Sequence, residues 1–398
     1  MTISPNGNRH HTPRAARLED GPVRVGVIGY GYWGPQLVRN FQDLPEAILT
    51  GVAEPRQDRL SHLQQRYSGV GLYADYRALL ETDVEAVVVA TPIQTHYAIA
   101  RDAILAGKHV LVEKPLTSNL EDAVRLNALA HTAGVTLMAG HTFLYNPAVR
   151  ALKTIVQSGE LGRVHYVDTA RLSLGLFQRQ VNVIWDLAPH DISILSYVLD
   201  RKPVAVSARG SSCVQPNVHD VAYIEVQYDG GLSAQIHVSW LDPAKVRRIT
   251  VVGDRKMAVY NDVALAEKIR IYDKGVESPP TDTFGEFQLS YRNGQITIPF
   301  IPWQEPLKIE CEHFVSCVRT GDDPITDGQQ GLAVVALLEA ANRSLHSDGV
   351  RVPITLPAAL RVRDPEVAAA SNGHSSHLNE LITIVDQPAA GRRMSASP

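Results

Sequence analysis

Lys114 ends a short apolar run, His109-Val-Leu-Val-Glu-Lys-Pro115, where its charge contrasts with the residues before it. The three apolar residues from 110 to 112 are typical of a parallel strand that is buried on both faces. Ligands of open α/β sheets bind just beyond the carboxyl ends of such strands. Lys114 is therefore a candidate catalytic group. The alternative is a lysine that pairs with Glu113 at an exposed sheet edge.

Asp186 and His190 lie four positions apart, so on a helix they share one face. Pro189 lacks a backbone N–H and is tolerated in a first turn, which predicts that this helix begins near Asp186. His190 would then lie near the helix N-terminus, where the dipole lowers its pKa while Asp186 acts in the opposite sense. A neutral histidine of this kind can accept a proton from an alcohol. A capping aspartate and a packed histidine are the alternative.

These three residues could together remove a proton and a hydride from a secondary alcohol. The hydroxyl proton must leave because a carbonyl forms as the hydride departs, so a base and a cation are needed at one oxygen. In one assignment Lys114 holds the hydroxyl, His190 is the base and Asp186 orients it. In the other assignment Lys114, desolvated among cations, is itself the base. The residues do not choose between the two.

A glycine-rich loop, Gly29-Tyr-Gly-Tyr-Trp-Gly34, follows the first apolar run and precedes a helical pattern. This spacing allows a tight turn, close approach of a pyrophosphate to the backbone, and close packing of the helix. Glu54 follows twenty residues after Gly34, where it can accept hydrogen bonds from ribose hydroxyls and would repel a ribose phosphate. NAD is therefore favoured over NADP, although Arg56 weakens that preference. A glycine turn without a ligand is the alternative.

Further cofactor contacts are expected at the same edge of the sheet. Thr91 and Pro92 follow another strand-like run, and His96 either lines the nicotinamide end or faces solvent. The complete set of predicted cofactor contacts is Gly29, Gly31, Tyr32, Trp33, Gly34, Glu54, Thr91, Pro92, His96, Glu113 and Lys114.

The elements that would position these groups fall into two patterns. In the first, strand-like runs alternate with helical patterns, which indicates βαβ units and a doubly wound parallel sheet. The predicted strands of this part are Val23–Ile28, Ile48–Ala53, Ala86–Ala90, Val110–Val112 and Val135–Met138. In the second, strands are separated by turns such as Asp229-Gly-Gly231, which indicates antiparallel hairpins in an α+β domain. Its predicted strands are Val164–Ser173, Val204–Cys213, Ala222–Tyr228, Leu232–Trp240 and Arg248–Val252, and its helices are Pro147–Ser158, Asp186–Leu199, Pro306–Thr320 and Gln329–Ser347.

The 398 residues are enough for two domains, each with its own core. We expect a disordered extension at 1–22 without the apolar core of a secretory signal, a Rossmann domain at 23–140, a substrate-binding domain at 141–356 and a flexible tail at 361–398. The net charge of −4 argues against nucleic acid or an anionic membrane as the main partner. The three cysteines have neither metal-ligand spacing nor an even number, so we expect no metal and a reducing cytoplasm.

The glycine loop, Glu113-Lys-Pro115 and the Asp186/His190 spacing resemble the glucose-fructose oxidoreductase, inositol dehydrogenase and rhizopine catabolism family, over residues 23–354. This resemblance implies an N-terminal Rossmann domain and a C-terminal domain whose open antiparallel sheet carries the substrate at the junction. It implies catalytic roles for Lys114, Asp186 and His190, and chemistry at one hydroxyl carbon of a sugar, cyclitol or sugar nucleotide. A homo-oligomer, either a dimer or a tetramer, is also expected.

Three stretches, Gly140–Pro147, Ala170–Arg171 and Trp185–His190, resemble the branch that acts on nucleotide-linked amino sugars and uronic acids, including oxidation at ring carbon three. Arginines suit carboxylate and phosphate groups. The predicted substrate contacts are Tyr145, Asn146, Arg171, Arg179 and Asn182. As an alternative, Arg171 is a cross-strand surface residue. For Lys245 to Arg248 a solvated loop is favoured over a diphosphate clamp.

The leading hypothesis is an NAD-dependent dehydrogenase that acts on a sugar ring hydroxyl in the biosynthesis of an unusual sugar, polysaccharide or natural product. Inositol or a free sugar is the alternative substrate. A regulator that binds the cofactor without chemistry is another class of function, although Lys114, Asp186 and His190 count against it. A glycosidase that uses bound NAD for transient oxidation is the third.

Overall fold

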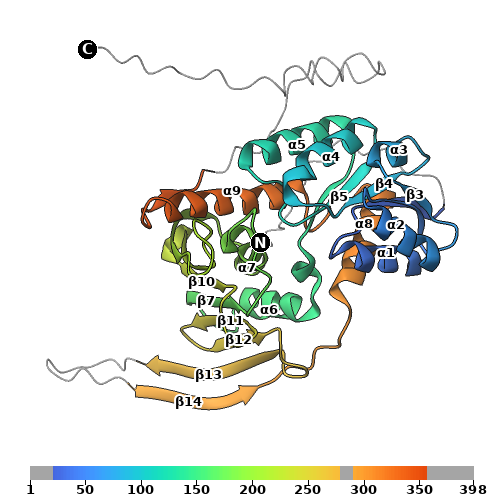
Figure 1. Ribbon diagram of the computed structural model, residues 1–398. Coiled ribbons are helices and arrows are strands. Elements are labelled where there is room, and N and C mark those ends of the chain that lie inside the picture. The colour runs from blue at the N-terminus through green and yellow to red at the C-terminus, as the bar shows by residue number, and fades with distance from the viewer. Residues whose placement is uncertain (1–20, 278–289, 356–398) are drawn as a thin grey trace, which may run out of the picture. The chain divides into compact units, whose positions relative to one another are not determined.

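The computed structural model describes residues 21–277 and 290–355. The expected tail at 361–398 and the extension, apart from residues 21 and 22, lie outside the described residues. Two β-sheets with their helices make up the described chain (Figure 1), and both belong to one compact unit. In these two ranges no helix combines the length and the apolar character that crossing a membrane requires.

The first sheet has six parallel strands in the order β3-β2-β1-β4-β5-β6, which is the doubly wound order of a dinucleotide-binding fold. The predicted parallel sheet is therefore confirmed. The strands are β1 (Val23–Ile28), β2 (Ala47–Ala53), β3 (Gly71–Tyr73), β4 (Ala86–Val89), β5 (His109–Glu113) and β6 (Leu137–Gly140). The sequence did not indicate β3, because three residues are too few to show a pattern.

Helices cover both faces of the first sheet. Val25 and Val27 of β1 point into one hydrophobic cluster while Ile28 points into the other, as expected when successive side chains alternate across a strand. The first cluster packs under α1 and α2, and the second under α3, α4 and α5. These helices are α1 (Gly34–Asp43), α2 (Gln57–Arg66), α3 (Tyr76–Leu80), α4 (Ile93–Leu105) and α5 (Leu120–Ala133).

The second sheet has nine strands in the order β14-β13-β12-β11-β7-β10-β9-β8-β15. Neighbouring strands are antiparallel except for the parallel pair β7 and β10 at its centre, so the expected antiparallel sheet is confirmed with this one difference. The strands are β7 (Val164–Leu172), β8 (Pro203–Ser211), β9 (Val221–Tyr228), β10 (Ser233–Ser239), β11 (Val246–Gly253), β12 (Met257–Asn261), β13 (Ile269–Glu277), β14 (Ser290–Thr297) and β15 (Val352–Pro353).

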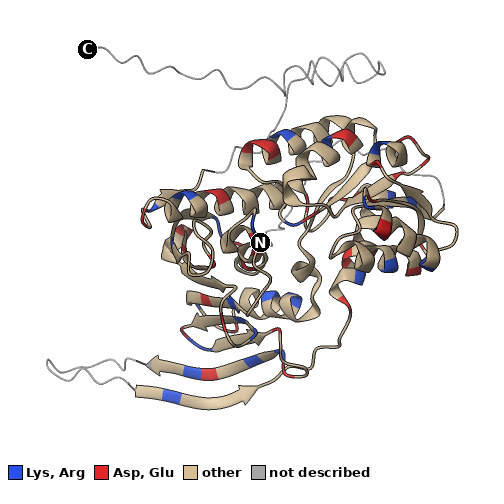
Figure 2. Cartoon of the chain, in the orientation of Figure 1, with Lys and Arg blue, Asp and Glu red and all other residues tan. Residues whose placement is uncertain are grey.

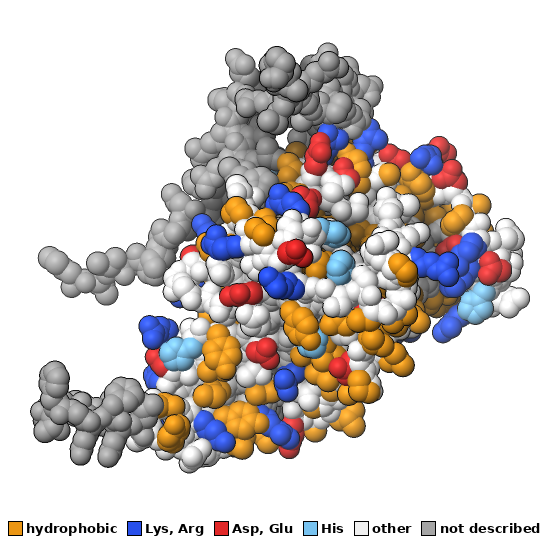
Figure 3. Space-filling model, turned by 60° about the vertical axis from the view of Figure 1, so that its left-hand side comes forward, with side chains coloured by type: hydrophobic (Ala, Val, Ile, Leu, Met, Phe, Trp, Pro, Cys, Tyr) orange, Lys and Arg blue, Asp and Glu red, His pale blue; other side chains and the backbone are white. Residues whose placement is uncertain are grey.

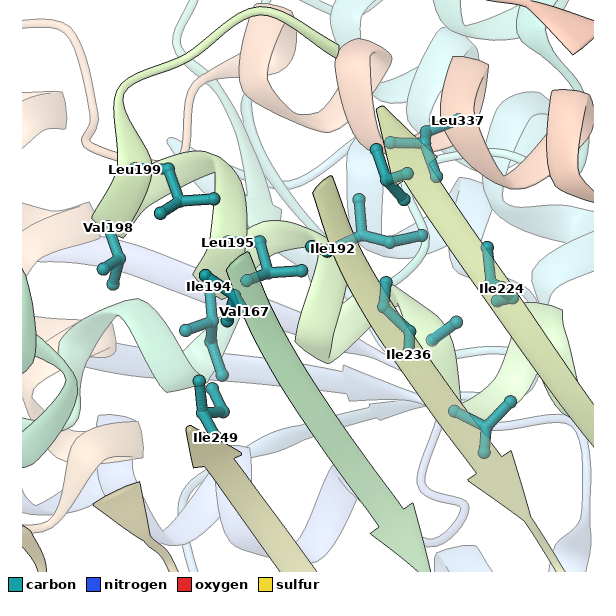
Figure 4. Close-up of a cluster of buried hydrophobic side chains, with 14 of the residues drawn as sticks. Val167, Ile192, Ile194, Leu195, Val198, Leu199, Ile224, Ile236, Ile249 and Leu337 are labelled. Carbon is teal, nitrogen blue, oxygen red and sulfur yellow. The ribbon is translucent and has the colours of Figure 1, made fainter. Parts of the chain in front are cut away.

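Three helices cover one face of the second sheet: α6 (Pro147–Gln157), α7 (Val183–Leu199) and α9 (Gly328–Leu345). Figure 4 shows the core between them, where Val167 and Ile236 of the sheet lie near Ile192 and Leu195 of α7. Alternate residues of the strands point into this core, which is why the hairpins have the period-two pattern of a half-covered sheet. The core fixes α7 against β7, and therefore the position of Asp186 and His190 on α7.

The last two helices connect the second sheet back to the first. α8 (Pro306–Thr320) packs against α1, and its Phe314 joins the same cluster as Phe41. α9 contributes Val335 to the core of the first sheet and Leu337 to that of the second. Because Ala139 of β6 also donates its N–H to the carbonyl of Thr326, at 2.7 Å, the C-terminal segment contacts both sheets.

Charged residues of both signs are distributed over both parts of the chain (Figure 2). This agrees with the small net charge of −4.

Candidate functional site

The glycine loop between β1 and α1 is tight at its first and third glycines and open at its second. Gly29 has φ of +98°, and a Cβ there would lie 2.6 Å from the carbonyl oxygen of Ala90. A Cβ at Gly34 would meet the carbonyl oxygen of Gly29. At Gly31 a Cβ would have no neighbour within 4 Å, so there is space for a pyrophosphate to approach the backbone.

The N-terminus of α1 is also suited to an anion. Trp33 occupies the capping position without a side-chain hydrogen bond to the helix, and Pro35 lacks an N–H. The N–H of Gln36 donates to the carbonyl of Trp33, so the N–H of Gly34 and the helix dipole are what favour a negative group there. Tyr32 beside the loop is 82% exposed, and Trp33 is partly exposed. Loop and helix therefore fit the diphosphate of NAD.

Glu54 lies directly after β2 and is buried. Its carboxylate accepts hydrogen bonds from the Tyr30 N–H at 2.8 Å and from the Arg56 side chain at 2.9 Å. Burial alone would raise the pKa of Glu54, but these hydrogen bonds outweigh it and lower the pKa, so the group is anionic. An anionic acceptor at this strand end suits ribose hydroxyls.

Thr91 and Pro92 lie between β4 and α4, at the same edge of the sheet, and His96 follows them in α4. Its ring is buried, with Nδ1 2.9 Å from the carbonyl oxygen of Pro115 and Nε2 2.9 Å from that of Thr91. The solvent-facing alternative is therefore wrong, and the cofactor contact of His96 stays a prediction. His96 connects the loop after β4 to the loop after β5, which carries Lys114.

Lys114 reaches from the end of β5 to α7. Its Nζ donates to the carbonyl oxygen of Asp186 at 2.9 Å and lies 3.6 Å from Asp186 Oδ1. The side chain is only 14% exposed, so the alternative of an exposed pair with Glu113 is wrong. The predicted catalytic lysine and the predicted acid thus meet, although 72 residues separate them along the chain.

Helix α7 begins earlier than predicted. Asn182 is the N-cap, and its side chain accepts from the N–H groups of Ile184 and Trp185. Pro189 therefore lies in the second turn, and His190 does not lie at the helix N-terminus. The prediction failed because the helix tolerates the missing N–H of Pro189, whose acceptor would have been the carbonyl of Trp185.

Asp186 and His190 share a face of α7 but are not hydrogen-bonded to each other. Asp186 Oδ2 accepts from the indole N–H of Trp240 at 2.9 Å, so Asp186 is positioned by Trp240 and Lys114 and does not orient His190. His190 packs edge-on against Phe143, with 5.0 Å between ring centroids, and its buried Nδ1 has no partner among the described residues. Burial lowers the pKa of His190 well below its ordinary value, and Lys114 lowers it further.

The sequence reasoning missed His141 as a site residue. It follows β6, is fully buried, and neither ring nitrogen has a partner among the described residues. Burial lowers its pKa to about 3, and the charge of Lys114 contributes, which places both side chains in one region. The position of His141 directly after a strand, beside the one that ends in Lys114, was the signal that could have identified it.

Glu113, predicted to contact the cofactor, is buried beneath Lys114. Its Oε2 accepts from the backbone N–H of Lys114 at 3.2 Å. Burial raises the pKa of Glu113 to about 7, although Lys114 opposes this. Glu310 of α8 is a second buried carboxyl nearby, and its pKa is raised well above the ordinary value by burial and by Glu113. The two carboxyls therefore form a buried acidic pair under Lys114.

Two of the predicted substrate contacts bind residues of the second domain. Arg171 contacts α7 beside His190, and Asn146 contacts Tyr260 of β12. Arg171 is buried and forms an ion pair with Asp191, with Nε to Oδ2 at 2.6 Å, so the surface alternative is wrong. Its guanidinium lies 4.6 Å from the centre of the Phe143 ring. Asn146 caps α6 and also points its amide at Asp262, at 3.4 Å.

The solvated-loop interpretation of residues 245–248 is wrong from Val246 onward, because β11 begins there. Arg247 of β11 is paired with Arg171 of β7 in the antiparallel register.

The remaining predicted contacts are placed otherwise. Tyr145 is fully buried, and its hydroxyl is 3.0 Å from Thr326 Oγ1, so it is a core residue. Asn182 caps α7 and donates to Asn342 at 2.8 Å. Arg179 and Asn182 line a cavity of about 490 Å³ beside the first turn of α7. Other residues around this cavity include Gln94, Ser118, Trp185 and His346.

Comparisons with known proteins agree with this architecture. The model of the oxidoreductase family with an NAD-binding Rossmann fold matches residues 23–141, and the GFO/IDH/MocA C-terminal domain model matches 149–259. Myo-inositol 2-dehydrogenase of Thermotoga maritima is 26% identical over 81% of this chain and 96% of its own. UDP-N-acetylglucosamine 3-dehydrogenase of Acidithiobacillus ferrooxidans is 28% identical over 79% of this chain and 94% of its own.

The solved structure of the Acidithiobacillus enzyme superimposes with a TM-score of 0.70 at 24% identity, covering 82% of this chain and 98% of that one. The two family models together match more than half of the sequence, in the order of the two sheets described above. The chain therefore belongs to the GFO/IDH/MocA family and is an NAD-dependent dehydrogenase of the type that acts on sugar hydroxyls.

Proposed function

We propose that this enzyme transfers hydride between NAD and one ring hydroxyl of a nucleotide-linked sugar, at ring carbon three. The main support for hydride transfer is the position of Lys114. It lies at the edge of the first sheet that also carries the glycine loop, and its side chain reaches α7, the helix that contains His190. NAD supplies the hydride acceptor when it is bound. The protein groups must then hold the hydroxyl and take its proton.

We assign proton transfer to His190 and orientation of the oxygen to Lys114. His190 is kept neutral by burial, and its free Nδ1 can accept a hydrogen bond. Lys114 is fixed by Asp186, which Trp240 fixes in turn. A cation held in this way stabilises negative charge that develops on the substrate oxygen, without having to reorganise. Exchanging the roles of Lys114 and His190 is the alternative.

A nucleotide-linked substrate is supported by the cavity of about 490 Å³ beside α7. The cavity wall includes Asn182, the N-cap of α7, and Trp185 in the first turn of that helix. The next residue of the helix, Asp186, contacts Lys114. An aromatic ring, amides and Arg179 suit a base and a phosphate. The similarity to UDP-N-acetylglucosamine 3-dehydrogenase supports the same choice, whereas the similarity to inositol 2-dehydrogenases supports a cyclitol or free sugar as the alternative.

Purified protein incubated with NAD and matched sets of sugar nucleotides, free sugars and inositols tests this proposal. Turnover is followed by reduced-nicotinamide absorbance, and cofactor released on denaturation is measured because tightly held NAD would hide turnover. We expect oxidation of a sugar nucleotide at carbon three. Absence of reduction with every substrate, together with absence of released cofactor, would refute the assignment, and preference for an inositol would favour the alternative.

We also propose that the enzyme is a cytoplasmic homo-oligomer, either a dimer or a tetramer. The three cysteines are free. Exposed aromatic residues lie on strands of the second sheet, including Tyr166, Tyr223 and Tyr291. Hydrophobic side chains gather over the lower part of the face in Figure 3, with charged side chains around them, as at the apolar centre and polar rim of many protein interfaces. Light scattering after size exclusion distinguishes a monomer from a dimer or tetramer.

A further inference from the structure

Trp240 directly follows β10 inside the second sheet, and its side chain is fully buried. β10 lies between β7 and β9, so the ends of these two neighbouring strands are beside Trp240. On one side, the carbonyl of Trp240 accepts from the N–H of Gly175, at 2.9 Å. On the other side, the N–H of Trp240 donates to the carbonyl of Asp220, also at 2.9 Å. The main chain of Trp240 therefore anchors two different loops.

These two loops form much of the wall of the cavity beside α7. The first, residues 173–182, connects β7 to α7 and is called the strap; its Phe177 packs against the Trp240 indole, with 5.7 Å between ring centroids. The second, residues 212–220, connects β8 to β9 and is closed by the buried carboxylate of Asp220, which accepts from two N–H groups of the same loop. The cavity residues that the loops supply are Arg179, Gln180, Val181 and Asn182 from the strap, and Asn217 and Val218 from the second loop.

The side chain of Trp240 points to the reacting groups instead. An indole has a single N–H donor, and that of Trp240 is used on Asp186 Oδ2, at 2.9 Å. The other carboxylate oxygen, Asp186 Oδ1, lies 3.6 Å from Lys114 Nζ, which is longer than a hydrogen bond. Such contacts often tighten only when the substrate is bound. The orientation of the Asp186 carboxylate, and with it the distance to Lys114, therefore depends on Trp240.

We propose that Trp240 is a positioning residue that makes the rate of hydride transfer depend on the group bound in the cavity. A nucleotide in the cavity would fix the strap and the second loop, and these fix Trp240, Asp186 and Lys114 in turn. This rests on the proposed function and adds that the nucleotide part of the substrate increases the rate as well as the affinity. Binding energy from a remote part of a substrate is used in this way when it orients the reacting groups.

A kinetic test compares UDP-N-acetylglucosamine with free N-acetylglucosamine in single turnovers at saturating NAD and sugar. Wild type should react faster with the UDP-linked sugar, by about 5- to 150-fold, the usual range of coupling between two sites. Trp240→Phe keeps a ring beside Phe177 but removes the N–H, so the two rates should become similar while the dissociation constant of UDP is unchanged. Trp303→Phe is the matched control at a 77% exposed site and should behave as wild type. An unchanged rate ratio in Trp240→Phe overturns the proposal.

A second measurement requires no turnover. The NAD-loaded protein is treated with acetic anhydride with and without UDP, and acetylation of Lys114 is followed by peptide mass spectrometry. An amine held against a carboxylate stays protonated and reacts slowly. UDP should therefore slow acetylation of Lys114 in wild type and in Trp303→Phe, but not in Trp240→Phe.

The outcomes separate this proposal from the proposed function. If UDP slows acetylation through Trp240 but no sugar is oxidised, only the proposed function fails. Equal slowing in all three proteins would show that UDP merely shields Lys114, and no effect of UDP on wild type would show that the cavity is not coupled to it; either result overturns the proposal. Circular dichroism checks the fold of each variant. If Trp240→Phe does not fold, Phe177→Leu on the partly exposed strap replaces it and should reduce the effect of UDP.

Discussion

Replacing Asp191 with asparagine would leave the Arg171 guanidinium buried without a counter-ion. The two side chains are 2% and 5% exposed, and the Nε–Oδ2 distance is 2.6 Å. One nitrogen of Arg171 already lacks an acceptor. Removing one partner of a buried ion pair destabilises a protein by about 3–5 kcal/mol, because the remaining charge is desolvated and uncompensated. We expect Asp191→Asn to lie in this range.

Urea denaturation of the NAD-bound protein, followed by circular dichroism, measures this change in the free energy of unfolding. Asp168→Asn is the matched control, since Asp168 pairs with Arg248 across the same two strands on the exposed face, at 4.0 Å. These side chains are 44% and 51% exposed, so solvent screens their interaction. The control should change the free energy by less than about 0.5 kcal/mol.

The double variant Arg171→Met/Asp191→Asn tests whether an unpaired charge causes the loss. If it does, removing the guanidinium should restore part of the stability that Asp191→Asn loses, giving a favourable coupling between the two changes. A loss below about 1 kcal/mol in Asp191→Asn would refute the reasoning, since a buried unpaired charge is expected to give at least three times as much. A double variant as unstable as the sum of the single variants would refute it as well.

Three further predictions concern Lys114, its buried neighbour Glu113 and the glycine loop. Lys114→Met should lower the single-turnover rate of hydride transfer about 10²- to 10³-fold, the range for loss of one preorganised group that stabilises charge on the substrate oxygen. Lys108→Met, at the opposite end of the same strand, should not lower it, and equal losses would contradict the role of Lys114. Burial raises the pKa of Glu113 from 4.5 to about 7, so wild type loses stability as pH rises through that window. The stability of Glu113→Gln relative to wild type should therefore increase over the same window, by up to about 3 kcal/mol. Thermal unfolding at pH 5 and pH 8.5 measures this difference, and a difference that does not change with pH would contradict the prediction. Gly31→Ala should weaken NAD binding in calorimetry without changing the melting temperature, because its Cβ meets no protein atom. Gly34→Ala should lower the melting temperature, because its Cβ meets the backbone of Gly29. A lower melting temperature in Gly31→Ala but not in Gly34→Ala would contradict the open loop.

Most of the fold could be predicted from the sequence because the central strands have clear patterns. β4, which lies beside β1, is an uninterrupted apolar run, and the strands that face α7 alternate apolar and polar residues. β14 could not be predicted, because nearly all of its residues are exposed and it pairs only at the edge of the sheet. β12 has only five residues, too few for a reliable pattern.

The parts of the candidate site that lie at the ends of single strands could be predicted from the sequence. Lys114 and the glycine loop follow from the rule that ligands bind at the carboxyl ends of parallel strands. Tyr145 was assigned wrongly because the short 3₁₀ turn at Thr142–Tyr145 directs Phe143 toward His190 and Tyr145 toward the core. Sequence spacing does not determine such a turn. The pairing of Arg171 with Arg247 depends on strand register, which is a long-range property.

The return of α8 and α9 to the first sheet determines how this protein can be recombined with its relatives. A chimaera cut after residue 141, where the N-terminal family model ends, would retain the glycine loop but lose Phe314, which packs beside Phe41, and Val335. Exposed apolar surface of that kind promotes aggregation. An exchange of substrate specificity should therefore replace a segment inside the chain, such as 149–259, and keep both C-terminal helices with their original nucleotide-binding half.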